Sequence, residues 1–297
     1  MGTSNQIGGE EIRYADILLD DWFKRSFKEY GNAKRLMQLF LEALIPERKI
    51  ASLEYTSEES TNQNPDKKSV RVDVECVDEK GERFVVEVQR APQVDFFDRA
   101  IFNSTFSIQR QLPEGSKRYR FKPVYFIGIT RFTLHPGDMR CLYQYSLTER
   151  TSGALMTNDL NYIFLEVSKC KDHPEASYIE KIGYALNNMG SFKRRPSGFA
   201  GEFFDLLFKS ADFSTFAETE RLKYLNSMTT ERDIQNQIEY AHEEGLKEGE
   251  AKGREEGREE GREEERLALA ANFKAQGVPI KVISEATGLT EQQIQNL

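Results

Sequence analysis

The sequence predicts an α/β fold with a mixed sheet flanked by helices, and three observations support this fold class. Helical patterns come first in the 297-residue chain, strand patterns fill the middle, and helical patterns return from residue 178 onward. The segment Val124–Ile129 is nearly continuously apolar, which is typical of a central strand with both faces covered. Ahead of it, residues 70–89 alternate between apolar and polar side chains on both sides of a glycine-containing turn, which predicts a β-hairpin.

Two helices and a strand are predicted before the hairpin. Apolar residues at helical spacing predict the first helix over Tyr14–Tyr30. The second helix covers Ala33–Leu44 and ends before Pro46, because the residue that precedes a proline disfavours helical geometry. A strand is predicted over Ile50–Thr56, and a polar loop over Ser57–Lys68 leads into the hairpin.

The hairpin brings two acidic side chains together. If Asp78 pairs with Glu82 across the turn, the same antiparallel register places Asp73 opposite Glu87, with Cβ atoms about 5 Å apart. Both acids and Gln89 lie on the strand face that the alternation leaves polar, so we expect that face to be open to chemistry. Two carboxylates this close repel each other unless a proton or a cation lies between them, and an oxygen-rich pair suits Mg²⁺ or Mn²⁺.

The acidic hairpin also allows two interpretations without a metal. Acidic side chains on the wet face of an antiparallel pair are common, and most of them are simply solvated. A slip of the strand register by one residue would also remove the pairing of the two carboxylates, and the sequence alone allows such a slip.

The remaining elements of the core are predicted from the same patterns. Pro92 opens a helix that runs to Leu112, since proline is favoured in a first helical turn. Its predicted packing face consists of Phe96, Phe97, Ala100, Ile101, Ser104 and Ile108. Two further strands and three further helices complete the core, namely Arg140–Thr148, Asn161–Val167, Tyr178–Met189, Phe199–Phe208 and Glu218–Met228.

A charged repeat follows the core. Five glycines recur every four residues within Glu239–Arg266, between Glu, Lys and Arg: Gly245, Gly249, Gly253, Gly257 and Gly261. A step of four residues nearly keeps one helical face, so the glycines form a bare stripe that favours close helix–helix contact and a homo-oligomer. The alternative is a solvated helical linker, because each glycine costs a lone helix about 1 kcal/mol relative to alanine.

The last thirty or so residues are expected to form a small helical module. Its predicted helices are Leu267–Ala275, Pro279–Ala286 and Glu291–Leu297, the last with Thr290 as its N-cap. This order is compatible with a helix-turn-helix unit, but the last helix has no Lys or Arg, so a protein-docking cap is favoured over DNA reading. The predicted domains are 1–230 (the mixed α/β core), 231–266 (charged helix) and 267–297 (helical module).

Composition and charge exclude several classes of protein. The net charge is −8, of which −5 falls within Glu243–Arg266, so the rest of the chain carries about −3 and can still present a DNA-binding face. Three widely spaced cysteines form neither a zinc pattern nor a disulfide framework, which favours a reducing cytoplasm. No apolar run is long enough to span a membrane, and the three histidines lack metal-ligand spacing.

Four motifs in order resemble one protein family. They are the opening Asp21–Phe27 (DWFKRSF), the hairpin core with Asp73, Asp78–Gly81 and Val86–Gln89 (VEVQ), the glycine–glutamate repeat, and the ending Ile283–Thr290 (ISEATGLT). Over nearly its whole length the chain resembles the Rpn family of recombination-promoting nucleases and transposases, a branch of the PD-(D/E)XK nuclease superfamily. The resemblance implies a restriction-endonuclease-like core, with a mixed sheet flanked by helices, followed by a helical C-terminal extension.

The same resemblance implies roles for residues of the hairpin. Asp73 and Glu87 would hold Mg²⁺ or Mn²⁺, helped by the carbonyl of Val88. Gln89 falls where the superfamily usually has lysine. Because glutamine is neutral, it can orient water or an oxygen atom but cannot offset the charge of the transition state, so weak turnover is compatible with this residue. Arg99 matches the arginine on the family's helix after the core.

These features predict a metal-dependent DNA endonuclease that hydrolyses phosphodiester bonds, with a link to recombination or mobile elements. The predicted catalytic residues are Asp73, Glu87 and Gln89, with Asp21 or Glu42 considered as a further acidic ligand. The predicted contacts to the DNA backbone are Arg99, Arg110, Lys117, Arg118 and Arg120, for which a solvated loop is the alternative. A function of a different class is the alternative. The chain would then be a scaffold with a catalytically weak or inactive nuclease fold, and it would oligomerise through the glycine-striped helix.

Overall fold

The computed structural model describes residues 6–7, 10–56, 72–112, 115 and 117–297. The chain divides into two compact units, Met1–Ser227 and Met228–Leu297, which are described separately. A short two-stranded sheet of β1 (Gln6–Ile7) and β2 (Glu10–Glu11) precedes the main body of the first unit. The polar loop predicted at Ser57–Lys68 lies outside the described residues.

The first unit is built on a six-stranded mixed sheet with the order β3-β4-β5-β6-β8-β7. Its strands are β3 (Leu53–Tyr55), β4 (Val74–Asp78), β5 (Arg83–Gln89), β6 (Val124–Thr130), β7 (Leu142–Ser146) and β8 (Leu160–Glu166). Strands β5, β6 and β8 run parallel, and the other neighbouring pairs are antiparallel. Every residue of β6 is buried, which confirms the prediction of a central strand there.

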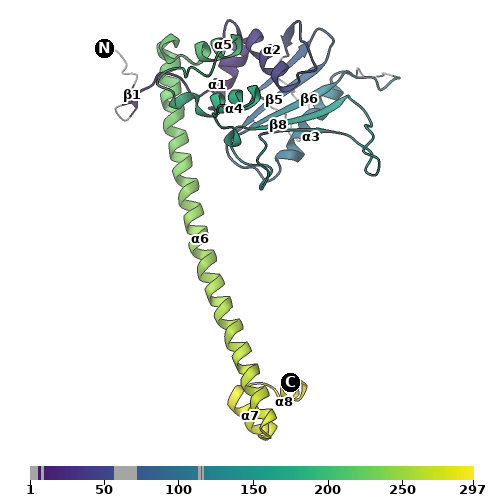
Figure 1. Ribbon diagram of the computed structural model, residues 1–297, viewed down its shortest axis with the longest axis vertical. Helices are drawn as coiled ribbons and strands as arrows, with labels where there is room; N and C mark the ends of the chain where they lie inside the picture. Colours follow the sequence, from purple (N-terminus) through teal and green to yellow (C-terminus); the bar gives the residue numbers. More distant parts are fainter. Residues whose placement is uncertain (1–5, 8–9, 57–71, 113–114, 116) are drawn as a thin grey trace. The chain divides into compact units, whose positions relative to one another are not determined.

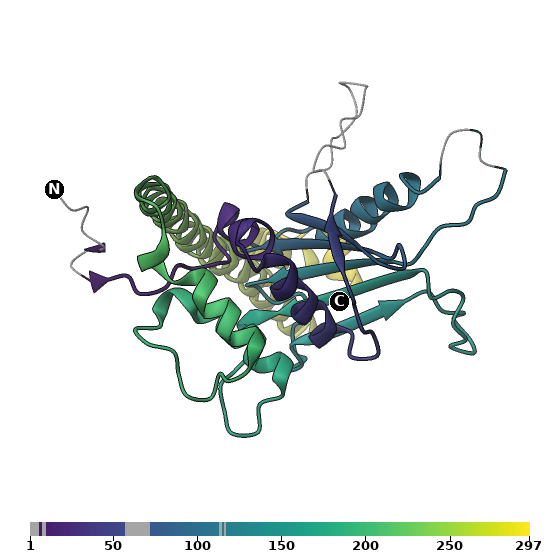
Figure 2. The ribbon, with the colours of Figure 1, turned by 90° about the horizontal axis from the view of Figure 1, so that it is seen from above.

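Helices cover both faces of this sheet, as the α/β prediction requires (Figure 1, Figure 2). The larger core lies on one face, against the helices α1 (Asp20–Lys24), η1 (Arg25–Glu29), α2 (Ala33–Leu44), α4 (Tyr178–Asn188) and α5 (Glu202–Ala211). Helix α3 (Phe96–Gln109) covers the other face, where Phe96 and Ala100 pack on Val85, Phe126 and Phe164. The connections include three short 3₁₀ turns, η2 (Val167–Lys169), η3 (Met189–Ser191) and η4 (Phe213–Thr215).

The first predicted helix is wrong at its start. Residues 14–19 are not helical, and the π-helix η1 follows α1 directly. Tyr14 forms a β-bridge with Asp212, and the Ala15 N–H donates to the carbonyl of Ala211 at 2.8 Å. The backbone of this segment is therefore paired with the end of α5, and that tertiary pairing replaces the local helical hydrogen bonds.

Helix α3 also departs from its prediction. It begins at Phe96 rather than at Pro92, and its buried stripe consists of Phe96, Ala100, Asn103, Ser104 and Ser107. Phe97 and Ile101, which were placed on the packing face, are 42% and 53% exposed. The helix is turned so that its polar residues Asn103 and Ser107 face the sheet, because they donate to buried acidic side chains there.

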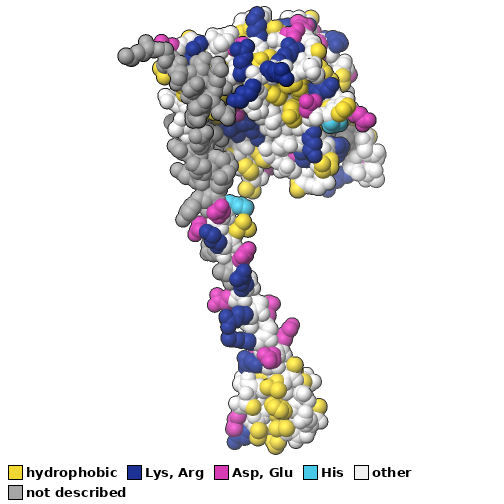
Figure 3. All heavy atoms as spheres, turned by 60° about the vertical axis from the view of Figure 1, so that its left-hand side comes forward, with side chains coloured by type: hydrophobic (Ala, Val, Ile, Leu, Met, Phe, Trp, Pro, Cys, Tyr) yellow, Lys and Arg dark blue, Asp and Glu magenta, His cyan; other side chains and the backbone are white. Residues whose placement is uncertain are grey.

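The second unit consists of most of α6 (Glu218–Ala275) together with α7 (Ile280–Thr287) and α8 (Glu291–Asn296). The predicted helices Glu218–Met228 and Leu267–Ala275 are the two ends of α6, and the glycine repeat lies between them in the same helix. Figure 3 shows the described charged side chains of both signs along that stretch. A small core follows, formed by Ala270, Ile283, Leu289 and Ile294.

The predicted cap of the last helix is confirmed. The Thr290 side chain accepts a hydrogen bond from the Gln293 N–H, and the Gln293 side chain accepts one from the Thr290 N–H, which together make a capping box. None of the helices in the described part of the chain combines the length and the apolar run that a bilayer crossing requires.

Candidate active site

The predicted hairpin register is right. Val74 pairs with Val86 and Cys76 with Phe84, and the Asp78 N–H donates to the Glu82 carbonyl at 3.0 Å. The turn closes at Gly81, whose φ of +81° lies in the left-handed region that glycine adopts without strain.

Asp73 lies just beyond the point where this ladder ends. The pairing of β4 with β5 stops at Val74, so the next inward N–H on β5, that of Val88, has no ladder carbonyl to bind. The Asp73 Oδ2 atom accepts that hydrogen bond instead, at 2.6 Å. Asp73 is therefore attached to the backbone of β5 by its side chain, rather than standing as a simple cross-strand neighbour of Glu87.

Glu87 is buried, with 2% of its surface exposed. The expectation of an open face on the hairpin is wrong, because α3 covers the face that carries this carboxylate. Arg99 on α3 forms an ion pair with Glu87, and Asn103 Nδ2 donates to Glu87 Oε2 at 3.2 Å. Arg99 and Asn103 are four residues apart, so both reach the same point from one side of the helix.

The pKa of Glu87 is raised to about 7, mainly by burial and also by the nearby charge of Asp73, while Arg99 and the hydrogen bond from Asn103 oppose the shift. This repulsion means that the two carboxylates lie within electrostatic reach of each other, as the hairpin predicted. A carboxyl group with a pKa near 7 changes its charge at neutral pH, so a nearby cation or proton controls its state.

Gln89 and Arg99 are connected through the same cluster. Arg99 Nη1 lies 3.5 Å from Gln89 Oε1 and 3.1 Å from Gln93 Oε1, and Gln89 Nε2 donates to the carbonyl of Ala91 at 3.1 Å. The guanidinium thus links the buried Glu87 to the amide that occupies the position of the superfamily's lysine. The contact of Arg99 with the DNA backbone stays a prediction. Within the protein, Arg99 binds Glu87, Gln89 and Gln93.

The family model described as PD-(D/E)XK nuclease family transposase matches residues 18–241. This chain belongs to that family. The matched range includes the hairpin, α3 and all of the predicted site residues, so the PD-(D/E)XK assignment supports a nuclease-type function for this part of the molecule. Neither the search of curated proteins nor the search of solved structures returned a match.

The restriction-endonuclease-like fold implied for a PD-(D/E)XK protein agrees with the observed mixed sheet and its flanking helices. Within the described residues, no third His, Cys, Asp or Glu joins the two carboxylates in a group suited to a metal. The acids considered for that position have other partners. Asp21 forms an ion pair with Lys223 at 2.6 Å, and Glu42 Oε1 accepts from the Ile50 N–H at 2.9 Å.

Glu75 is a second buried acid on the α3 side of the hairpin, and no pattern in the sequence predicted its partners. It is 5% exposed, and it accepts hydrogen bonds from Arg110 at 2.5 Å, Ser107 at 2.7 Å and Arg83 at 3.2 Å. Arg110, predicted to contact DNA, is therefore engaged with this carboxylate. Glu75 pairs with Val85, which lies two residues before Glu87 on β5. Residues two apart on a strand point to the same face, so the predicted register already placed both acids on one face.

The other predicted DNA contacts lie in the segment between α3 and β6. Lys117, Arg118 and Arg120 are exposed there. Gln111 holds the base of this segment, since its Oε1 accepts from the Lys122 N–H at 2.7 Å. Contact of Lys117, Arg118 and Arg120 with DNA stays a prediction.

Proposed function

We propose that this protein is a divalent-metal-dependent DNA endonuclease that hydrolyses phosphodiester bonds, in keeping with a family of nuclease-type transposases. The observation that carries the proposal is the meeting of Asp73, Glu87 and the Val88 peptide at the end of the β4–β5 ladder. A role in recombination or in the movement of DNA elements is part of the same proposal and rests on the family description.

The residues present fit Mg²⁺ or Mn²⁺. The Gln89 carbonyl accepts from Arg131 on the β6 side, and successive peptide groups of a strand point to opposite sides, so the Val88 carbonyl points toward the side of Asp73. Two carboxylates and a carbonyl form the oxygen-rich set that these hard cations prefer. Burial is the main reason why the pKa of Glu87 is raised to about 7, so a bound cation would favour its ionised form.

The ion would supply charge neutralisation at the scissile phosphate and activation of an attacking water molecule when bound. The chain's own residues prepare the site for it. Asp73 is held by the Val88 N–H, and Glu87 is held by Asn103 and Arg99, so both carboxylates have fixed positions. Gln89 can orient a water molecule or a phosphate oxygen, and Arg99 provides the one positive charge seen in contact with Glu87 among the described residues.

A nicking assay on supercoiled plasmid tests this proposal. With Mg²⁺ or Mn²⁺, we expect Asp73→Asn to reduce nicking by at least about 100-fold, because losing a metal ligand costs more than losing one of its supporting partners. Asp98→Asn is the matched control, since Asp98 is exposed on α3 and is expected to leave nicking unchanged. Equal nicking by wild type and Asp73→Asn would remove Asp73 from the site.

A thermal melt gives a second readout that does not depend on cleavage. Mn²⁺ should raise the melting temperature of the wild type, because a ligand that binds only the folded state stabilises it. The same addition should leave Asp73→Asn unchanged. A similar rise for both proteins would place the ion elsewhere.

One observation favours the scaffold as a second candidate. Glu87 already has a cationic partner in Arg99, so the buried carboxylate is partly neutralised without an ion. In a scaffold the glycine stripe of α6 assembles copies of the chain, and a Cβ built on any of its five glycines meets no described atom within 4 Å. Replacing Gly249, Gly253 and Gly257 by alanine separates the possibilities. A smaller sedimentation coefficient indicates an assembly through the stripe, and raised helicity with unchanged sedimentation indicates a solvated linker.

A further inference from the structure

A pocket of about 440 Å³ lies on the same face of the sheet as Glu87 and is separate from that site. Phe97 and Ile101 on α3, Tyr162 and Phe164 on β8, Tyr145 on β7 and His135 line it. Five of these six side chains carry flat aromatic or imidazole rings. Phe164 is 1% exposed and lies at the bottom, whereas Phe97 and Tyr145 are 42% and 43% exposed at the mouth.

The rings meet edge to face. The centroid of Phe97 lies 5.0 Å from that of Phe164 and 5.7 Å from that of His135, with interplanar angles of 81° and 69°. Tyr145 approaches Phe164 at 5.9 Å in the same way. Rings that stand at steep angles to one another thus surround the cavity, which suits a flat guest that stacks on one ring and meets the edges of others.

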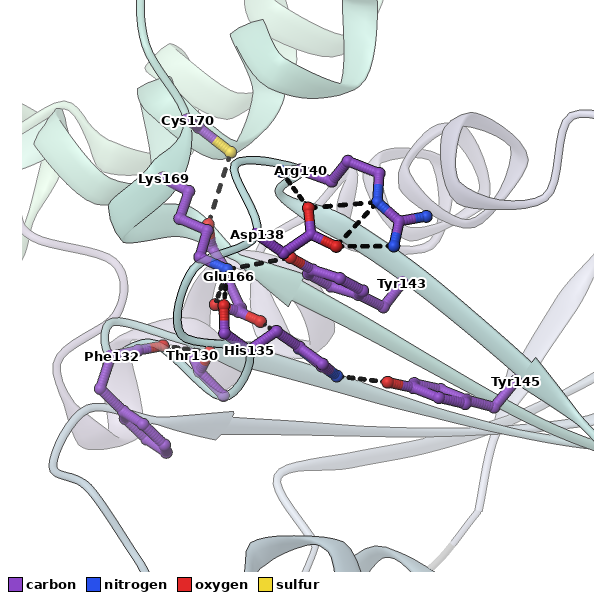
Figure 4. A network of polar contacts seen from close by, with 10 residues as sticks. All are labelled: Thr130, Phe132, His135, Asp138, Arg140, Tyr143, Tyr145, Glu166, Lys169 and Cys170. Carbon is purple, nitrogen blue, oxygen red and sulfur yellow. Dashed lines mark hydrogen bonds and ion pairs between the residues drawn. The ribbon is translucent and has the colours of Figure 1, made fainter.

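A buried polar network fixes one edge of the pocket (Figure 4). Glu166 is fully buried at the end of β8 and contacts His135 Nδ1 at 2.5 Å. Lys169 Nζ forms an ion pair with Glu166 at 2.8 Å and donates to the hydroxyl of Tyr143 at 2.9 Å. The His135 ring stacks on Tyr143, with centroids 3.7 Å apart.

This network holds the ring of His135 at the wall of the pocket. His135 contacts Glu166 through Nδ1 and the hydroxyl of Tyr145 through Nε2, so both ring nitrogens are engaged with protein atoms. The surface that lines the pocket is almost entirely apolar, so a guest would be held by contact with the rings.

The sheet register places the pocket close to the candidate active site. Glu87 is in register with Gly128, and Gly128 with Phe164, so the bottom of the pocket lies two strands from Glu87, about 10 Å away. Phe96 sits between them above Gly128, since a Cβ built there would meet Phe96 at 3.0 Å and Phe164 at 2.9 Å. About 10 Å is the rise of roughly three stacked nucleotides.

We propose that this ring-lined pocket binds an unpaired nucleobase of the DNA whose backbone is cut beside Glu87. The inference rests on the proposed function for the choice of DNA as the source of the base. A base has the flat faces and the size that the pocket complements, and stacking on aromatic side chains holds single-stranded bases in many proteins. A protein segment of aliphatic side chains would leave the ring faces without a flat partner.

Fluorescence of 2-aminopurine tests the pocket without any cleavage. The full chain is titrated, in EDTA, into a short single-stranded oligonucleotide that carries one 2-aminopurine base. We expect quenching on binding, and Phe97→Ala should weaken the affinity by about tenfold through loss of one stacking ring. Phe102→Ala is the matched control, because Phe102 is also a phenylalanine of α3 with 42% exposure but packs on Phe106 outside the pocket.

Tyr145→Phe should keep the quenching and most of the affinity, since it retains the ring and the surface that lines the pocket is almost entirely apolar. Equal affinities for Phe97→Ala and Phe102→Ala, or equal quenching with the base paired in a duplex, would overturn the proposal. A change of sedimentation caused by Phe97→Ala, with no quenching by the wild type, would show a second copy of the chain in the pocket and overturn it as well.

The two proposals fail separately. Quenching that depends on Phe97, in a protein that does not nick plasmid, supports the pocket and removes only the endonuclease. Nicking that depends on Asp73, without quenching by the unpaired base, supports the endonuclease and removes only the pocket.

Discussion

At the scale of single residues, Glu87 shows how burial creates a group that titrates near neutral pH. Its carboxylate lies beneath α3, and burial raises its pKa to about 7 even though Arg99 and Asn103 contact it. Glu79 at the hairpin turn is exposed instead, and backbone hydrogen bonds lower its pKa. Burial and the nearby charge of Asp73 therefore make the ionised form of Glu87 unfavourable.

This raised pKa predicts how stability depends on pH. The folded state keeps a proton on Glu87 between about pH 4.5 and 7 while the unfolded state has released it, so the stability that this group contributes falls as pH rises through that window. Relative to Glu87→Gln, the wild type should lose on the order of 3 kcal/mol across the window and show no further change above it. Urea unfolding of both proteins at pH 5, 6, 7 and 8 measures the difference. A difference that stays constant or grows with pH contradicts the buried, shifted carboxyl group.

At the scale of elements, α3 contributes side chains both to the candidate active site and to the aromatic pocket. One side of the helix carries Arg99 and Asn103 toward Glu87, and another carries Phe97 and Ile101 to the aromatic pocket. The helix can lie this close to the sheet because β6 has a glycine at position 128 beneath Phe96. The distance between α3 and the sheet therefore determines the geometry of both sites.

A single added methyl group tests this arrangement. In Gly128→Ala the new Cβ would lie 2.9 Å from a Phe164 ring atom and 3.0 Å from a Phe96 ring atom, so the rings must move. We expect a loss of about 1–3 kcal/mol in the free energy of unfolding from overpacking. Gly31→Ala is the control, because a Cβ at Gly31 meets nothing within 4 Å among the described residues and should not destabilise the protein. Denaturant midpoints compare the two, and equal midpoints would argue against close contact over β6.

At the scale of the whole molecule, the chain contains two units with very different cores. The first buries side chains on both faces of a six-stranded sheet, whereas the described core of the second rests on Ala270, Ile283, Leu289 and Ile294. A core of this size offers little apolar burial to offset the entropy of ordering its helices. The second unit should therefore be the more easily opened of the two.

Ile283→Ala makes this difference measurable. Ile283 is fully buried, and truncation of a buried isoleucine typically costs about 2–5 kcal/mol. We expect hydrogen exchange of the full chain to lose protection in α7 and α8 while protection in β5 and β6 is unchanged. Protection lost in both units together would show that they unfold as one cooperative body.

Several local elements follow from the sequence alone. Val124–Ile129 is a central strand, Ala33–Leu44 is a helix, and Thr290 caps the last helix, because apolar spacing and capping chemistry act over a few neighbouring residues. The sequence alone also suggested the register that brings Asp73 near Glu87 but left open a slip of one residue, and the structure has the register that pairs Val74 with Val86.

Tertiary contacts settle which faces are covered. No local pattern shows that α3 lies over the acidic face and buries Glu87, that Asp73 binds the Val88 N–H, or that residues 14–19 pair with the end of α5. The same holds for Glu166 and the rings around the pocket, which come from separate strands, a helix and a loop. These outcomes depend on contacts between segments far apart in the chain, where packing and buried charge outweigh the preferences of neighbouring residues.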